Sequence, residues 1–195
     1  MKRSEFGSFL RALGPHEVSF DGVAYTVSAG DKRYLAEPPF PPRPELITPR
    51  NTMLAEHLAS RPKIAVVLVH MGEYAIGLFE GTSLVLYKTG HHFIRGRTKK
   101  GGSSSSRYAR VRSQQRSEFL DGVCFSFEVL LGQSLIEHIF FGGPRETVKA
   151  FAKECGALER HKSRIQARLI PARHANLETL RECIEDVWRF TVKEL

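Results

Sequence analysis

Residues 95–116 read RGRTKKGGSSSSRYARVRSQQR, and the rest of the chain is organised around this stretch. It holds eight Lys or Arg residues and no Asp or Glu, so it matches the formal net charge of +8 of the whole chain. Its centre, Gly101–Ser106, carries no side chain larger than a hydroxymethyl group and cannot anchor itself by burying apolar surface. We expect a mobile cationic loop whose backbone can approach a crowded anionic partner, for which RNA is the obvious candidate.

The residues before this stretch predict strands. Ile64–Val69 is a continuous apolar run, which is typical of a strand buried on both faces. Residues 73–80 and 83–88 follow after short turns and predict an antiparallel meander. His91–Ile94 either extend this meander or begin another strand.

The residues after it predict alternating helices and strands. Apolar residues recur every three or four positions over 107–131, so we expect one long helix whose core-facing stripe consists of Tyr108, Val111, Phe119, Val123, Phe127 and Leu130. A strand over 135–141, a helix over 145–155, a strand over 164–170 and a helix over 176–192 complete the order. This order predicts an α/β fold with a mixed sheet and flanking helices.

Residues 1–60 differ in composition and predict a small N-terminal unit, separate from residues 61–195. Helical spacing over 4–13 and two short strands, 18–20 and 23–27, joined at Asp21-Gly22 indicate a helix and a hairpin. The Pro-rich segment 37–44 predicts a stiff connector or a strap over the domain, in preference to an SH3-type ligand, and a helix is expected over 49–59.

Composition narrows the class of protein. With 42% hydrophobic and 26% charged residues the chain is globular, and its longest apolar run is too short to span a bilayer. The N-terminus lacks an apolar signal core, so we expect a cytoplasmic protein with no membrane partner. Cys124, Cys155 and Cys183 show no metal-ligand spacing and are expected to be buried free thiols.

A motif within the basic stretch resembles a known family. Gly101–Arg112 fit Gly-Gly-x-Ser-x-x-Arg-aromatic-Ala-Arg-x-Arg, which is similar to the catalytic loop and following helix of the eukaryotic and archaeal class 1 peptide-chain release factors. It resembles even more closely the Vms/Ankzf-type peptidyl-tRNA hydrolases of ribosome quality control. The resemblance covers about residues 63–192 and implies a ribonuclease-H-like release-factor catalytic domain carrying a small N-terminal extension.

The resemblance also implies an activity. The chain would hydrolyse the peptidyl-tRNA ester and release nascent chains from stalled ribosomes or large subunits, as a monomer without metal or organic cofactor. The implied partners are the large ribosomal subunit, rRNA and peptidyl-tRNA. The implied catalytic residues are Gly101, Gly102, Ser103 and Ser104, and the implied RNA-binding residues are Arg95, Arg97, Lys99, Lys100, Arg107, Arg110 and Arg112.

One departure from the family pattern concerns catalysis. Release factors have Gln directly after the two glycines, where its main chain acts at the ester and its side chain fills the pocket, and this chain has Ser103. Ser103 keeps a main-chain N–H but lacks the amide side chain. A non-catalytic ribosome-binding or RNA-binding rescue module of the same fold is therefore the alternative.

Several residues have competing interpretations. Gln114 and Gln115 are accessory candidates, although a helix-surface or core amide is favoured for both because they lie more than two helical turns from the loop. Arg107, Arg110 and Arg112 either contact RNA or brace the domain through a carboxylate such as Glu118. A two-metal nuclease is disfavoured because the acids show no grouping at strand ends.

Overall fold

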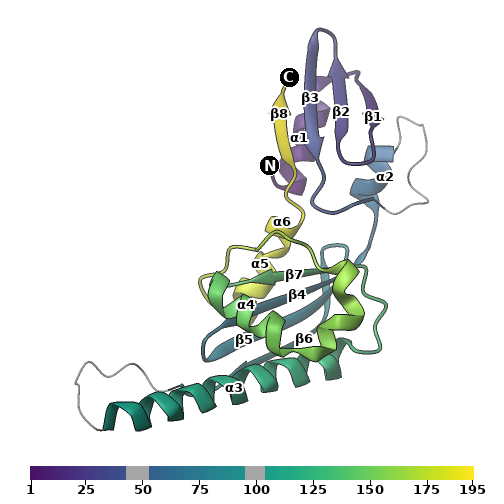
Figure 1. Cartoon of the computed structure of the whole chain (residues 1–195). Helices are drawn as coiled ribbons and strands as arrows, with labels where there is room; N and C mark the ends of the chain where they lie inside the picture. The colour runs from purple at the N-terminus through teal and green to yellow at the C-terminus, as the bar shows by residue number, and fades with distance from the viewer. Residues whose placement is uncertain (43–52, 95–103) are drawn as a thin grey trace. The chain divides into compact units, whose positions relative to one another are not determined.

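The computed structural model describes residues 1–42, 53–94 and 104–195 of the chain, which divides into two compact units. The first unit consists of Met1–Arg61 together with Ile184–Leu195, and the second of Pro62–Cys183 (Figure 1). The sequence analysis placed the second unit at residues 61–195. The last residues of the chain instead return to the first unit, because they supply a strand to its sheet.

The second unit is built on a four-stranded mixed sheet with strand order β6-β5-β4-β7. Its strands are β4 (Lys63–His70), β5 (Glu73–Glu80), β6 (Ser83–His91) and β7 (His138–Gly142). Neighbours pair antiparallel except β4 and β7, which pair in parallel. The sequence analysis predicted this meander, and β6 extends it as far as His91.

Helices cover both faces of this sheet. The long helix α3 (Ser104–Leu131) and α4 (Arg145–Glu154) pack on the face that carries Val67, Ile76 and Leu78. The opposite face receives α5 (Leu177–Glu182), where a Cβ on Gly77 would lie 2.8 Å from a methyl group of Leu84 and 2.9 Å from one of Leu180, so these side chains would have to shift to admit a larger residue. The predicted α/β class, a mixed sheet with flanking helices, is confirmed.

Two predicted elements of the second half were wrong. The strand expected over 164–170 does not form: the 3₁₀ helix η2 (Gly156–Arg164) ends at its first residue, and residues 165–170 make two isolated bridges, Ile139 to Ile165 and Gly142 to Ile170. The helix expected over 176–192 is divided into α5, α6 (Ile184–Val187) and the strand β8 (Thr191–Glu194). Its apolar spacing is helical, but Leu180 belongs to the second unit while Val187 and Trp188 belong to the first.

The described part of the first unit contains a four-stranded antiparallel sheet with order β1-β2-β3-β8 and three helices, one of which is α6. The other elements are α1 (Arg3–Leu13), β1 (Glu17–Phe20), β2 (Tyr25–Ala29), β3 (Lys32–Glu37), α2 (Met53–Ala59) and β8. The helix and the hairpin were predicted, whereas β3 and β8 were missed. Phe6, Tyr25, Val27 and Phe190 are completely buried in its core.

The Pro-rich segment is a strap over this core as far as the structure describes it. Phe40 is 3% exposed, and its ring meets that of Trp188 edge to face with the centroids 4.9 Å apart. A segment that buries its aromatic residue in its own domain is not an exposed ligand, so the interpretation as a strap holds for 37–42. Residues 43–44 and the first residues of the helix expected over 49–59 lie outside the described chain.

The prediction of free thiols was wrong for two of the three cysteines. Cys124 of α3 and Cys155, which caps the end of α4, form a disulfide bond, while Cys183 is a buried thiol that is not part of a disulfide. The two partners are separated by 31 positions, and their proximity depends on how α3 and α4 pack. In the described ranges, no helix is both long enough and apolar enough to cross a membrane.

Candidate functional site

The predicted site residues fall into two groups. Arg95, Arg97, Lys99, Lys100, Gly101, Gly102 and Ser103 lie outside the described residues, so their arrangement stays a prediction. Ser104 is the first residue of α3, and Arg107, Arg110, Arg112, Gln114 and Gln115 all belong to this helix. The described part of the site is therefore the frame on either side of the Gly-Gly motif.

The chain is held to the second unit where it leaves β6. The backbone N–H of His92 donates to the carbonyl of Gly72 in the β4–β5 turn at 2.8 Å, and Ile94 packs against the core. His91 and His92 are both exposed. The last described residues before the motif are therefore positioned by the sheet.

Helix α3 has two halves that differ in burial. Every buried side chain in the described part of α3 belongs to its second half, which begins at Phe119, whereas residues 106–118 are all exposed or half-buried. Figure 1 shows the first half of α3 extending beyond the sheet. Ser104–Glu118 would span about 22 Å at the usual helical rise. We call residues 104–118 the projecting half of α3 and residues 119–131 the anchored half.

Specific contacts reinforce the anchored half. The Tyr74 hydroxyl lies 2.8 Å from the Ser126 hydroxyl oxygen and links β5 to α3. Tyr74 takes this position over Gly90, its cross-strand partner, where a Cβ would lie 2.4 Å from the tyrosine ring. The Cys124–Cys155 disulfide adds a covalent link to the end of α4. Sequence reasoning missed both links because each joins residues far apart in the chain.

The projecting half carries basic side chains that face solvent. Arg107, Arg110 and Arg116 are exposed, and no carboxylate in the described chain pairs with them. Glu118 instead accepts a hydrogen bond from Gln114 Nε2 at 2.9 Å. The described contacts therefore do not include the proposed bracing of Arg107 and Arg110 by Glu118.

These arginines are arranged around the helix in a regular way. At 100° per residue, Arg107, Arg110 and Gln114 share one side of α3, opposite the core-facing stripe of the anchored half. Arg112 is half-buried, and Arg116 lies in line with the core-facing stripe, beyond the sheet. Positive charge therefore surrounds the projecting half, which suits a partner that contacts it from several directions.

The two glutamines are not placed for chemistry at the motif. Gln114 lies ten residues from the start of α3, which corresponds to about 15 Å along the axis, and its amide is engaged by Glu118. Gln115 is half-buried. Among the described residues, no group of three or more His, Cys, Asp or Glu side chains is arranged to hold a metal ion.

A mixed sheet that presents a basic helix directly after a Gly-Gly motif is the arrangement of a release-factor-like, translation-related domain. The chain belongs to the Actinobacteria/chloroflexi VLRF1 release factor family (acVLRF1), whose sequence model matches residues 62–193. The match covers the whole sheet of the second unit and all of α3.

Known proteins of this type resemble parts of the chain. It is 27% identical over 128 residues to peptide chain release factor subunit 1 of Thermococcus onnurineus, covering 62% of this chain and 31% of that protein. It is 26% identical over 125 residues to the Aeropyrum pernix protein of the same name, covering 62% of this chain and 34% of that protein. The chain therefore spans about a third of the length of these relatives.

Two solved structures superpose on parts of the chain. The archaeal translation termination factor aRF1 superposes with a TM-score of 0.48 at 18% identity, over 65% of this chain and 37% of that one. The Vms1 mitochondrial localization core superposes with a TM-score of 0.49 at 11% identity, over 96% of this chain and 82% of that one.

Proposed function

We propose that this chain is a ribosome rescue factor that hydrolyses the ester of peptidyl-tRNA on stalled ribosomes or free large subunits. The observation that carries the proposal is the projecting half of α3, whose exposed arginines follow a Gly-Gly motif. Membership of a release factor family agrees with it. The cytoplasm is the proposed compartment, and the proposed active form is a monomer.

The proposed division of labour follows from the chemistry. Ester hydrolysis needs a positioned water and a donor for the developing oxyanion. Gly101 and Gly102 let the main chain approach the ester without a Cβ clash, and the N–H of Ser103 donates to the oxyanion. Arg107, Arg110 and Arg112, together with Arg95, Arg97, Lys99 and Lys100, neutralise phosphates of the surrounding RNA.

Single-turnover release of peptide from peptidyl-tRNA on stalled large subunits tests the proposal. The wild-type chain should release peptide, and Gly102→Ala should lower the rate at least tenfold while particle binding stays within about twofold, because a Cβ obstructs approach but removes no charge. No release by the saturating wild-type chain would refute hydrolysis.

The arginines are tested separately through binding. Arg107→Glu with Arg110→Glu should weaken binding to the large subunit and flatten its dependence on salt, since each lost phosphate contact lowers the slope by about 0.7–0.9. Arg145→Glu with Lys153→Glu makes the same change of four charges at exposed positions of α4 and serves as the matched control. If both variants lost the same affinity for the large subunit, the loss would reflect net charge in general and not a contact made by α3.

The alternative, a non-catalytic rescue module, is favoured by one observation, the serine at position 103. Ser103→Gln restores the residue that release factors carry there. If the wild-type chain binds the particle without releasing peptide and Ser103→Gln gains release, the chain is a binding module whose loop has lost its catalytic group.

A further inference from the structure

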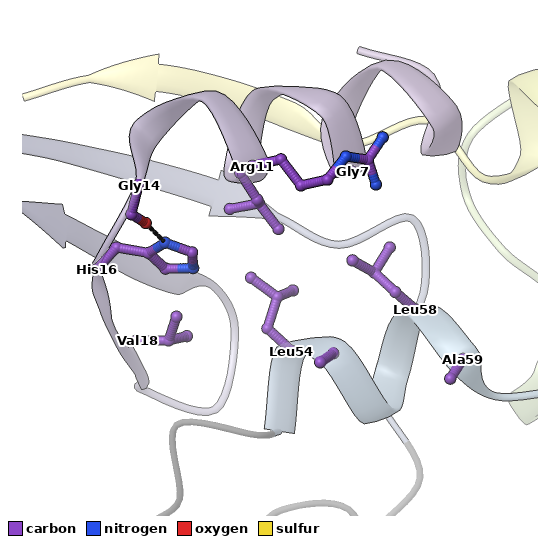
Figure 2. Close-up of a pocket in the computed structure, with 10 residues that line it drawn as sticks. Gly7, Arg11, Gly14, His16, Val18, Leu54, Leu58 and Ala59 are labelled. Atoms are coloured by element: carbon purple, nitrogen blue, oxygen red, sulfur yellow. Dashed lines mark hydrogen bonds between the residues drawn. The ribbon is translucent and has the colours of Figure 1, made fainter.

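A groove in the first unit lies outside the residues matched by the family model. It is walled by α1 and α2, has a volume of about 620 Å³ and is closed at one end by β1. Figure 2 shows Leu54 and Leu58 of α2 pointing toward α1, with His16 and Val18 at the closed end. The volume falls in the range of about 300–1,000 Å³ typical of pockets for small molecules.

The groove combines an apolar floor with basic groups. Leu54 is buried, and Leu10, Val18 and Leu58 are half-buried along the groove. The charged or titratable groups among its lining residues are Arg11 and His16, and that lining set contains no carboxylate in the described chain. His16 Nδ1 lies 2.7 Å from the carbonyl of Gly14, which leaves Nε2 for a second polar contact.

A glycine keeps the groove open. Gly7 lies inside α1 and lines the groove, although glycine is a poor helix former. A Cβ at position 7 would meet nothing nearer than Arg11 Nη1 at 3.8 Å, which is an ordinary contact. Packing of the first unit therefore does not require glycine here, and the missing side chain adds free space to the groove.

We propose that this groove binds a small aliphatic carboxylate, with the chain along the leucines and the carboxylate at Arg11. The charge of the lining selects an anion, and the floor selects an aliphatic body. The length favours a small molecule over a peptide: α2 has seven residues and is about 10 Å long. A stable protein–protein interface buries about 800 Å² on each partner, which such a short wall does not provide.

The guanidinium of Arg11 is exposed and donates to Ser8 Oγ at 3.0 Å, so it contributes modestly to affinity. Most of the binding comes from burial of the aliphatic chain, and Arg11 determines the preferred sign of the head group. Charge reversal at this residue should therefore change the selectivity more clearly than the overall affinity.

Titration of the full chain with decanoate, below its micelle concentration and followed by methyl NMR, tests the proposal. We expect saturable shifts at Leu54 and Leu58, with decanoate bound more tightly than decanol or decylammonium. Arg11→Glu should weaken decanoate about twofold to fivefold and reverse its order with decylammonium. Arg33→Glu, at an exposed arginine of β3 that does not line the groove, should leave that order unchanged.

Gly7→Leu supplies the steric test, because leucine fills the groove and is also the better helix former. It should abolish decanoate binding without lowering the melting temperature. Any one of three results would overturn the proposal. The first is that decanoate causes no saturable shifts, the second is that Gly7→Leu binds decanoate as the wild type does, and the third is that decylammonium binds as tightly as decanoate. None of these measurements involves ribosomes, so their outcome is independent of the proposed rescue function.

Discussion

Replacement of Ser113 by proline would test whether the projecting half of α3 is independent of the core. The substitution removes the N–H that bonds to the carbonyl of Ala109 and places the ring against that carbonyl, at a local cost of about 3 kcal/mol or more. The helical segment before it is too short to be stable alone in water. We therefore expect the first third of the 28-residue helix to unfold.

The same structure predicts little effect on global stability. No side chain in the described part of 106–118 is buried, so the loss of these turns exposes no core surface. The free energy of unfolding should change by no more than about 0.5 kcal/mol, as for other surface changes. Urea denaturation measures this quantity, and hydrogen exchange measures the local loss of protection over 104–112.

Phe125→Pro is the matched control, because Phe125 is 65% exposed but belongs to the anchored half. Proline there breaks the turns that carry Val123 and Phe127, both completely buried, and should lower the free energy of unfolding by about 3 kcal/mol or more. If Ser113→Pro destabilised the chain as strongly as Phe125→Pro, the division of α3 into two halves would be wrong.

Three further predictions concern the second unit. Tyr74→Phe removes the hydrogen bond to Ser126 and should lower the free energy of unfolding by about 0.5–1.5 kcal/mol in urea denaturation. Reduction of the Cys124–Cys155 disulfide should cost about 3–4 kcal/mol, given its sequence separation of 31, and calorimetry with and without reductant measures this. Burial, and to a smaller extent Arg164 and Arg160, lower the pKa of His161. The unfolded chain therefore takes up a proton on His161 at a higher pH than the folded chain does. The free energy of unfolding should fall as the pH drops below about 6.5, and denaturation at several pH values measures this fall.

Each of these predictions has a control. Ser126→Ala should cost about as much as Tyr74→Phe, and the two should not be additive, because they remove the same hydrogen bond. In the Cys124→Ser Cys155→Ser double variant, reductant should not change the melting temperature. If reductant also left the melting temperature of the wild type unchanged, the disulfide would not stabilise the chain. His161→Phe should flatten the dependence of the free energy of unfolding on pH. If this variant shows the same dependence as the wild type, another group causes it.

The parts of the fold that were predicted from the sequence have local signals. Ile64–Val69 is apolar without interruption, and the core-facing residues of α3 repeat every three or four positions from Phe119 to Leu131. The elements that were missed depend on distant partners. β8 is polar except for Val192, and it becomes a strand because it pairs with β3, more than 150 positions earlier in the chain.

The arrangement of the candidate site stays a prediction, and only the helix after its motif can be compared with the structure. Gly101–Arg112 fit the motif because its spacing is local, and α3 begins at Ser104, two positions after Gly102, where the sequence predicted a helix from about residue 107. The burial boundary at Phe119 was not predicted, since Tyr108 and Val111 continue the same helical spacing beyond the sheet. Periodicity shows which side of a helix is apolar but does not show where its support ends.

The pairing of β8 with β3 has a consequence for folding during synthesis. All of Pro62–Cys183 is synthesised before Thr191–Glu194, so every residue of the larger unit is made while the smaller unit still lacks a strand. Until then the edge of β3 presents unpaired backbone groups, which can join other chains. Newly synthesised copies of this protein are therefore prone to aggregation until Thr191–Glu194 have paired with β3.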